Sequence, residues 1–171
     1  MSTRSAFVFF VLLGLPALSG CELLLPSDAD GATPGGVVYA TSFETSHDLD
    51  GWDDVPERRR EASSSGGAWS AYVSSGCTGP FPTYTLTAPE DGTLVLRAWA
   101  RDLAIGGAVE LENTRTSERL WLSVDEPGWA SYQAEGVLTV RHGDTLRLRM
   151  SAGGFAFSAM LVDLLEVSQA E

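Results

Sequence analysis

Several short runs of this chain alternate hydrophobic and polar residues with a period of two. Because successive side chains of a β-strand point to opposite faces, such a run predicts a strand with one buried and one exposed face. The clearest runs cover residues 93–101, 108–112, 119–124 and 144–150. Their apolar positions predict a core made of Leu94, Leu96, Ala98, Ala100, Val109, Leu111, Leu120, Leu122, Val124, Leu146, Leu148 and Met150.

Weaker runs predict further strands at residues 37–44, 69–74, 83–87 and 129–134. Residues 155–167 are apolar at both parities, which is typical of a strand that is covered on both faces. No segment keeps a helical period of 3.6 residues over several turns. Many short strands separated by clusters of Gly, Pro, Asp and Ser indicate an all-β protein with a two-sheet antiparallel β-sandwich.

The first twenty residues follow a different pattern. Arg4 supplies a positive charge, residues 6–15 form an apolar run, and Pro16 ends it. Ten apolar residues are too few for a membrane-spanning helix, which needs about 20. A positive charge, a short apolar run and small residues at its end are typical of a cleaved secretory signal peptide.

The sequence Leu18-Ser19-Gly20-Cys21 follows this run and resembles the lipobox of bacterial lipoproteins. The resemblance implies cleavage before Cys21, a diacylglycerol thioether on its sulfur and a further acyl chain, such as palmitate, on the new amino terminus. Two acyl chains already hold a protein stably on a bilayer, at about 0.8 kcal/mol per buried methylene. An ordinary signal peptide followed by a chance cysteine is the alternative interpretation.

We therefore divide the chain into a signal peptide at 1–20, a lipidated cysteine with a flexible linker at 21–36, and one domain at 37–171. The linker is rich in Pro, Gly and Asp, which favour neither helix nor strand. The expected location is the bacterial cell envelope. Glu22, in place of the aspartate that retains some lipoproteins in the inner membrane, favours the outer membrane.

Charge limits the partners of this protein. The chain has 11 basic and 23 acidic residues, and every basic residue is arginine. Loss of the signal peptide removes only Arg4, which leaves ten basic residues against 23 acidic ones and a net charge of −13. Nucleic acids and anionic lipids both require a basic surface, so neither is an expected partner of the domain. If Cys21 carries lipid, Cys77 is left as a free thiol or as half of an intermolecular disulfide.

No catalytic motif is visible in the sequence. His47 and His142 are far apart, and each stands in a turn-like setting. The chain contains no nucleophile elbow, no zinc-ligand spacing and no phosphate-binding loop. We therefore expect that this protein is not an enzyme.

Several landmarks resemble the jelly-roll sandwiches of the galactose-binding-like class, which includes many carbohydrate-binding modules. In chain order they are Ser42-Phe43-Glu44, Asp50-Gly51-Trp52, Gly67-Ala68-Trp69-Ser70, the predicted strands at 94–101, 129–132 and 146–150, and the closing run at 161–167. The resemblance covers nearly all of the predicted domain and implies a jelly-roll fold. It also implies that Trp52, Trp69 and Trp129 lie in the core.

In those families a structural Ca²⁺ is often held by one acid near the first strand and one in the last strand. The matching positions here are Glu44 and Asp163. Asp163 stands among apolar residues, so its carboxylate is expected to be half-buried and to need a cation or several donors. Ca²⁺ takes six to eight oxygen ligands, so backbone carbonyls would supply the others. The alternative is a carboxylate that accepts hydrogen bonds from backbone N–H groups or from an arginine.

The exposed positions of the predicted strands carry tryptophan and arginine. These residues are Arg97, Trp99 and Arg101 in one run, Arg119 and Trp121 in another, and Arg147 and Arg149 in a third. If the strands lie in one sheet, they form an aromatic and polar platform, on which sugar rings would stack and accept hydrogen bonds. The alternative is a ladder in which Glu110 and Glu112 pair with the arginines across strands.

The sequence thus predicts a membrane-anchored binding module for a glycan or a cell-envelope polysaccharide. The alternative function is that of a structural or adapter lipoprotein that docks another envelope protein. A glycan module would expose Trp99 or Trp121 in a groove. An adapter would show a broad apolar patch or an unpaired edge strand.

Overall fold

The structure is a computed structural model that describes residues 36–64, 66–75, 81–153 and 158–170. All of them belong to one compact unit, Ala32–Glu171. Within this described part, no helix has the length and apolar character needed to cross a membrane. The predictions for the signal segment, Cys21, the linker, Cys77 and Phe155 concern residues outside these ranges.

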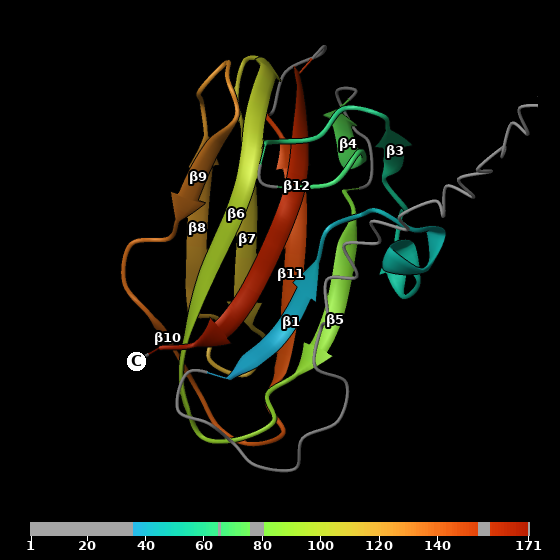
Figure 1. The fold of residues 1–171 in the computed structure, drawn as a ribbon. Coiled ribbons are helices and arrows are strands. Elements are labelled where there is room, and N and C mark those ends of the chain that lie inside the picture. Colours follow the sequence, from blue (N-terminus) through green and yellow to red (C-terminus); the bar gives the residue numbers. More distant parts are fainter. Residues whose placement is uncertain (1–35, 65, 76–80, 154–157, 171) are drawn as a thin grey trace, which may run out of the picture. The chain divides into compact units, whose positions relative to one another are not determined.

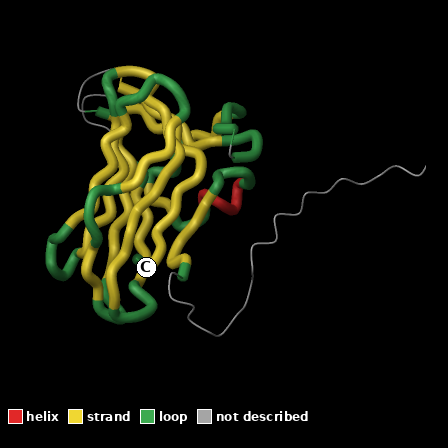
Figure 2. The backbone as a smooth tube through the Cα atoms, turned by 60° about the vertical axis from the view of Figure 1, so that its left-hand side comes forward, coloured by secondary structure: helices red, strands yellow, loops and turns green. Residues whose placement is uncertain are grey.

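The strands form two antiparallel sheets that pack face to face (Figures 1 and 2). The seven-stranded sheet contains β1 (Val37–Thr41), β3 (Glu57–Arg59), β4 (Ser70–Ser75), β6 (Gly92–Ala104), β9 (Ala130–Gln133), β10 (Leu138–Val140) and β12 (Ser158–Gln169). The five-stranded sheet has the order β2 (Trp52–Asp53), β5 (Thr83–Thr87), β11 (Thr145–Ala152), β7 (Gly107–Asn113) and β8 (Arg119–Val124). A short 3₁₀ helix, η1 (Ser46–Leu49), follows β1. The two-sheet jelly-roll sandwich predicted from the sequence is confirmed.

The long strands agree with the predicted runs. The run at 119–124 coincides with β8, and β6 continues three residues beyond the predicted end at Arg101. The strands β2, β3 and β10 and the helix η1 were not predicted. Each contains only two to four residues, and so short a segment cannot display a period.

The strand β12 is central to its sheet. It pairs with β6 along one edge and with both β4 and β1 along the other. The pairing with β4 ends at Val162 and that with β1 begins at Leu165, and the register against β6 shifts over the same interval. Asp163 therefore lies where the ladder of β12 is interrupted on both edges.

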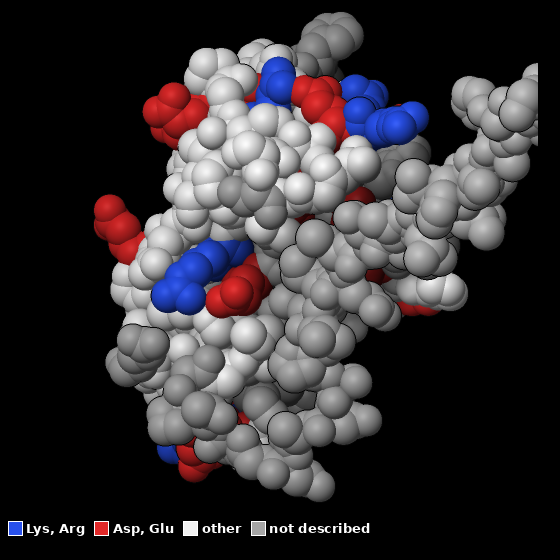
Figure 3. All heavy atoms as spheres, viewed as in Figure 1, with Lys and Arg blue, Asp and Glu red and all other residues white. Residues whose placement is uncertain are grey.

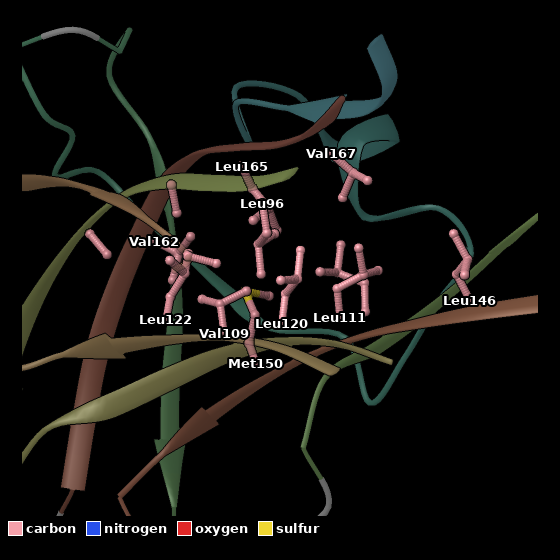
Figure 4. Packing of buried hydrophobic residues seen from close by; sticks show 14 of the residues in the cluster. Leu96, Val109, Leu111, Leu120, Leu122, Leu146, Met150, Val162, Leu165 and Val167 are labelled. Carbon is pink, nitrogen blue, oxygen red and sulfur yellow. The ribbon is translucent and has the colours of Figure 1, made fainter. Parts of the chain in front are cut away.

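The core lies between the two sheets (Figure 4). Leu96, Val162 and Leu165 of the seven-stranded sheet face Val109, Leu111 and Met150 of the five-stranded sheet. Each of the twelve side chains predicted for the core is buried. Trp52 also joins the core, but the core prediction is wrong for Trp69 and Trp129, which are only partly buried. Trp69 instead packs beneath the guanidinium of Arg58, whose Cζ lies 4.6 Å from the ring centroid.

A buried carboxylate links two turns at one end of the sandwich. Asp144 accepts hydrogen bonds from Arg115 at 2.6 and 2.8 Å, from the Asn113 side chain at 2.8 Å and from the Arg141 backbone N–H at 2.9 Å. The hydrogen bonds from Arg115 and from the Arg141 backbone hold the pKa of the Asp144 carboxyl well below its usual range. A carboxyl with a lowered pKa stabilises the folded state at neutral pH, and this contribution is lost as the pH falls.

We expect Asp144→Ala to lower the midpoint of thermal unfolding at neutral pH, because Asn113 and Arg115 lose their shared acceptor. The difference from the wild type should shrink as the pH falls below about 4, because the unfolded chain then takes up a proton at this carboxyl while the folded protein still keeps it ionised. Thermal unfolding of both proteins at neutral and acidic pH measures this difference. Asp125→Ala, at an exposed position, is the control and should change little. A difference that is independent of pH would contradict a stabilising role for the ionised Asp144 carboxylate.

Candidate functional site

The outer face of the five-stranded sheet is a grid of three rows across β11, β7 and β8. Its residues have the opposite parity to the buried ones, so they point away from the core. The rows are Arg147–Glu112–Arg119, Arg149–Glu110–Trp121 and Ser151–Ala108–Ser123. Charged and aromatic side chains fill two rows, while the third contains only small side chains.

Ion pairs connect the first two rows. Arg119 contacts both Glu110 and Glu112 at 3.2 Å, while Arg147 reaches Glu112 and Arg149 reaches Glu110 at 3.6 Å. The ladder of arginine and glutamate, the alternative interpretation of the sequence, is therefore present. Glu110 is on the outer face but is only 4% exposed, because it lies between two arginines and beside Trp121.

A hollow of about 370 Å³ lies over the row of small residues. Trp121 on β8 borders one side of it, and Arg149 on β11 borders the other together with Phe81. The Arg149 guanidinium carbon lies 5.5 Å from the Phe81 ring centroid. The turn between β6 and β7, which contains Ile105, also lines the hollow. The hollow thus combines apolar walls with one guanidinium.

A second hollow, of about 470 Å³, adjoins Trp121 at the edge of the sheet. β8 is the last strand of the five-stranded sheet, and β9, which supplies Tyr132 and Gln133 to this hollow, belongs to the other sheet. Trp121 and Ser123 line both hollows. The Trp121 side chain is 51% exposed, so its ring is accessible from the solvent between them.

The prediction of one platform that contains both Trp99 and Trp121 is wrong. β6, which carries Arg97, Trp99 and Arg101, belongs to the seven-stranded sheet, whereas β8 and β11 belong to the five-stranded sheet. Residues on the outer faces of two packed sheets point in opposite directions, so Trp99 and Trp121 cannot contact one flat ligand. Trp99 is also only partly exposed.

On the face of β6 and β12, basic side chains pair with acidic ones. Arg97 contacts Gln133 at 3.0 Å and Glu166 at 3.3 Å, and Arg101 pairs with Glu61. Most basic atoms seen on this face adjoin acidic atoms (Figure 3). These arginines are therefore part of an ion-paired surface.

The two predicted calcium ligands lie beside successive glycines, Glu44 beside Gly67 and Asp163 beside Gly66. The Glu44 carboxylate accepts hydrogen bonds from the backbone N–H groups of Ala68 and Trp69 at 2.9 to 3.0 Å. Arg58 donates hydrogen bonds to the backbone carbonyls of Phe43 and Glu44, and these bonds fix the backbone next to the Glu44 carboxylate. Backbone donors thus satisfy part of the Glu44 carboxylate, as the alternative interpretation has it, because Oε1 accepts two hydrogen bonds and Oε2 accepts one.

Asp163 is fully buried, and its Oδ2 accepts a hydrogen bond from the Ser63 N–H at 2.7 Å. Burial raises the pKa of the Asp163 carboxyl, the hydrogen bonds from Ser63 oppose this shift, and the charge of Glu44 adds to it. Within the described ranges, Oδ1 of Asp163 is buried and has no hydrogen-bond donor. A Cβ on Gly66 would overlap the Asp163 carboxylate, so the loop approaches this carboxylate as closely as only glycine allows.

These two acids fit part of a calcium site. Carboxylate oxygen is a ligand that Ca²⁺ prefers, and an oxygen atom without a donor is open to a cation. In the described part of the chain, no group of three or more His, Cys, Asp or Glu side chains could hold a metal ion. The other ligands of an ion at Glu44 and Asp163 would therefore be backbone carbonyls or water.

No protein-family model matches this sequence, and no curated protein matches it either. Solved structures do match. A CBM22 xylan-binding domain from Paenibacillus barcinonensis has a TM-score of 0.58 and 15% identity, over 82% of this chain and 99% of that one. A CBM22–GH10 pair of modules from a Clostridium thermocellum endo-1,4-β-D-xylanase, in complex with xylohexaose, has a TM-score of 0.53 and 10% identity, over 79% of this chain and 29% of that one.

These matches establish the class of the fold: a jelly roll like those of carbohydrate-binding modules. At this identity they carry the architecture alone, and one of the neighbours is itself part of an enzyme. Sequence reasoning identified Arg119, Trp121 and Arg149 but missed Phe81, Ile105 and Tyr132 as lining residues, and Arg147 lines neither hollow. The small residues at 108, 123 and 151 were the available signal, because small side chains in one row leave room for a ligand.

Proposed function

We propose that this protein is a lipid-anchored, non-catalytic module that binds a glycan on the outer face of its five-stranded sheet. The exposed Trp121 between two hollows carries the proposal. A tryptophan ring offers a flat apolar surface for the C–H face of a sugar. Arg149 at the rim of one hollow offers donors in a fixed fork for sugar hydroxyls.

The expected ligand is a chain of sugars, because two adjoining hollows share one tryptophan and can take successive units. Ligand sites in proteins are typically apolar concavities with a few fixed polar groups. The hollow over the row of small residues has this composition, with Phe81, Ile105 and Trp121 as apolar walls. The neighbours support the class of ligand, since one is a xylan-binding domain and the other was solved with xylohexaose. We propose no catalytic reaction for this protein.

We expect Trp121→Ala to weaken glycan binding by at least about 2 kcal/mol, a roughly thirtyfold loss of affinity, because the stacking surface is removed. Isothermal titration calorimetry of the full chain with xylohexaose and with cellohexaose measures the affinity of both proteins. Trp99→Ala is the matched control, since Trp99 lies in the other sheet, and it should keep the wild-type affinity. A wild type that binds neither sugar, or a Trp121→Ala variant that binds like wild type, would contradict the proposed site.

We also propose that Glu44 and Asp163 hold a structural calcium ion. When bound, calcium would neutralise two neighbouring carboxylates and join the loop at Gly66 to β12. Added Ca²⁺ should raise the midpoint of thermal unfolding of chelator-treated protein, and Asp163→Asn should abolish this rise. Glu166→Gln, on the same strand, should keep it. An unchanged wild-type midpoint would remove calcium from the proposal.

The anchor is proposed from the lipobox around Cys21. Cys21→Ser removes the sulfur that would carry the lipid, so the variant should leave the membrane fraction when bacterial cells are fractionated. Cys77→Ser is the matched control and should stay with the membranes. An outer-membrane location predicts that the wild type sediments with outer-membrane rather than inner-membrane fractions. A Cys21→Ser protein that remains in the membrane fraction would refute lipid anchoring at this residue.

A further inference from the structure

Ile105 has a backbone conformation that its own side chain disfavours. It stands at the turn between β6 and β7 with a φ of 65°, and the next residue, Gly106, has a φ of 81°. Two successive residues with positive φ are typical of a type I′ hairpin turn, for which Asn-Gly is the preferred pair. A β-branched residue with positive φ is an outlier that calls for a reason.

Packing within the protein does not supply that reason. The Ile105 side chain is 62% exposed, the largest exposed fraction among the large hydrophobic residues that the structure describes as exposed. Little apolar surface of Ile105 is therefore buried, so its burial does little to compensate for the strained backbone. The isoleucine side chain adds little to the stability of the fold.

The neighbours of the turn fix its backbone instead. The Gly153 N–H donates to the Gly106 carbonyl at 2.8 Å, and a Cβ on Gly153 would lie only 2.8 Å from the Ile105 carbonyl oxygen. A Cβ on Gly107 would come within 2.5 Å of Met160 Sδ. These contacts involve the backbone of the turn and not the Ile105 side chain. They would therefore remain if another residue replaced Ile105.

The side chain of Ile105 lines the hollow beside Trp121. It shares this lining with two aromatic residues, Trp121 and Phe81, and Arg149 is the one charged side chain among the described lining residues. Strained backbone conformations are found at ligand sites, where the strain positions a side chain for contact. An exposed apolar side chain at the rim fits the C–H edge of a sugar whose face stacks on tryptophan.

We infer that Ile105 contacts the bound glycan, and that its strained backbone lowers the stability of the fold. The inference rests on the proposed function and adds a specificity-determining residue to the site. Ile105 forms an apolar wall without hydrogen-bonding groups, while Arg149 supplies the donors. The turn between β6 and β7 therefore belongs to the binding site as well as to the fold.

The test is Ile105→Asn in the full chain. Asparagine suits the left-handed conformation, so the midpoint of thermal unfolding should rise by a few degrees. The affinity for xylohexaose or cellohexaose should fall about tenfold, the order of effect expected when one apolar contact is lost. Ile105→Val keeps the apolar wall and should keep affinity within about twofold, without the gain in stability.

Ser117→Asn is the matched control. Ser117 has a φ of 61° in the turn between β7 and β8, at the other end of β7 from Ile105, and it is exposed. This variant should gain stability in the same way and bind the sugar like wild type.

Three results would overturn the inference. If Ile105→Asn binds as tightly as the wild type, Ile105 does not contact the glycan, while the proposed site at Trp121 stands. If Ile105→Asn lowers the unfolding midpoint, Ile105 serves the fold. A wild type that binds neither sugar overturns the inference together with the proposed function.

Discussion

The apolar interface between the two sheets determines which side chains reach the surface. Leu96 and Leu165 on one sheet face Leu111 on the other, and these side chains are almost completely buried. Because each strand gives one parity to this interface, the other parity must lie on an outer face. The row formed by Arg149, Glu110 and Trp121 is thus a consequence of where the leucines pack.

The outer face of the five-stranded sheet has two kinds of surface. Where arginine and glutamate alternate across the strands, their side chains form ion pairs with one another. Where the row becomes Ser151, Ala108 and Ser123, the side chains are too short to fill the space, and the hollow opens beside Trp121. The candidate site therefore lies at the boundary between the ion-paired rows and the row of small residues.

In the seven-stranded sheet, the interruption of β12 determines where a carboxylate is buried. Between Val162 and Leu165 the strand changes neighbours on one edge and register on the other, and Asp163 is buried at this point. Burial removes water from the Asp163 carboxylate and so raises its pKa. The hydrogen bonds from Ser63 oppose this shift only in part. The glycine at position 66 lets the loop come close to this carboxylate.

The sequence by itself determined the parity of the long strands, the twelve core side chains and the all-β class, because a period of two records which face of a strand is buried. It also indicated Glu44 and Asp163 as a pair, through the resemblance to jelly-roll modules. Only the tertiary structure decided which sheet each strand joins, and hence that Trp99 and Trp121 lie on opposite faces. Sheet membership depends on hydrogen-bonding partners far away in the chain, and parity within one strand contains no record of them.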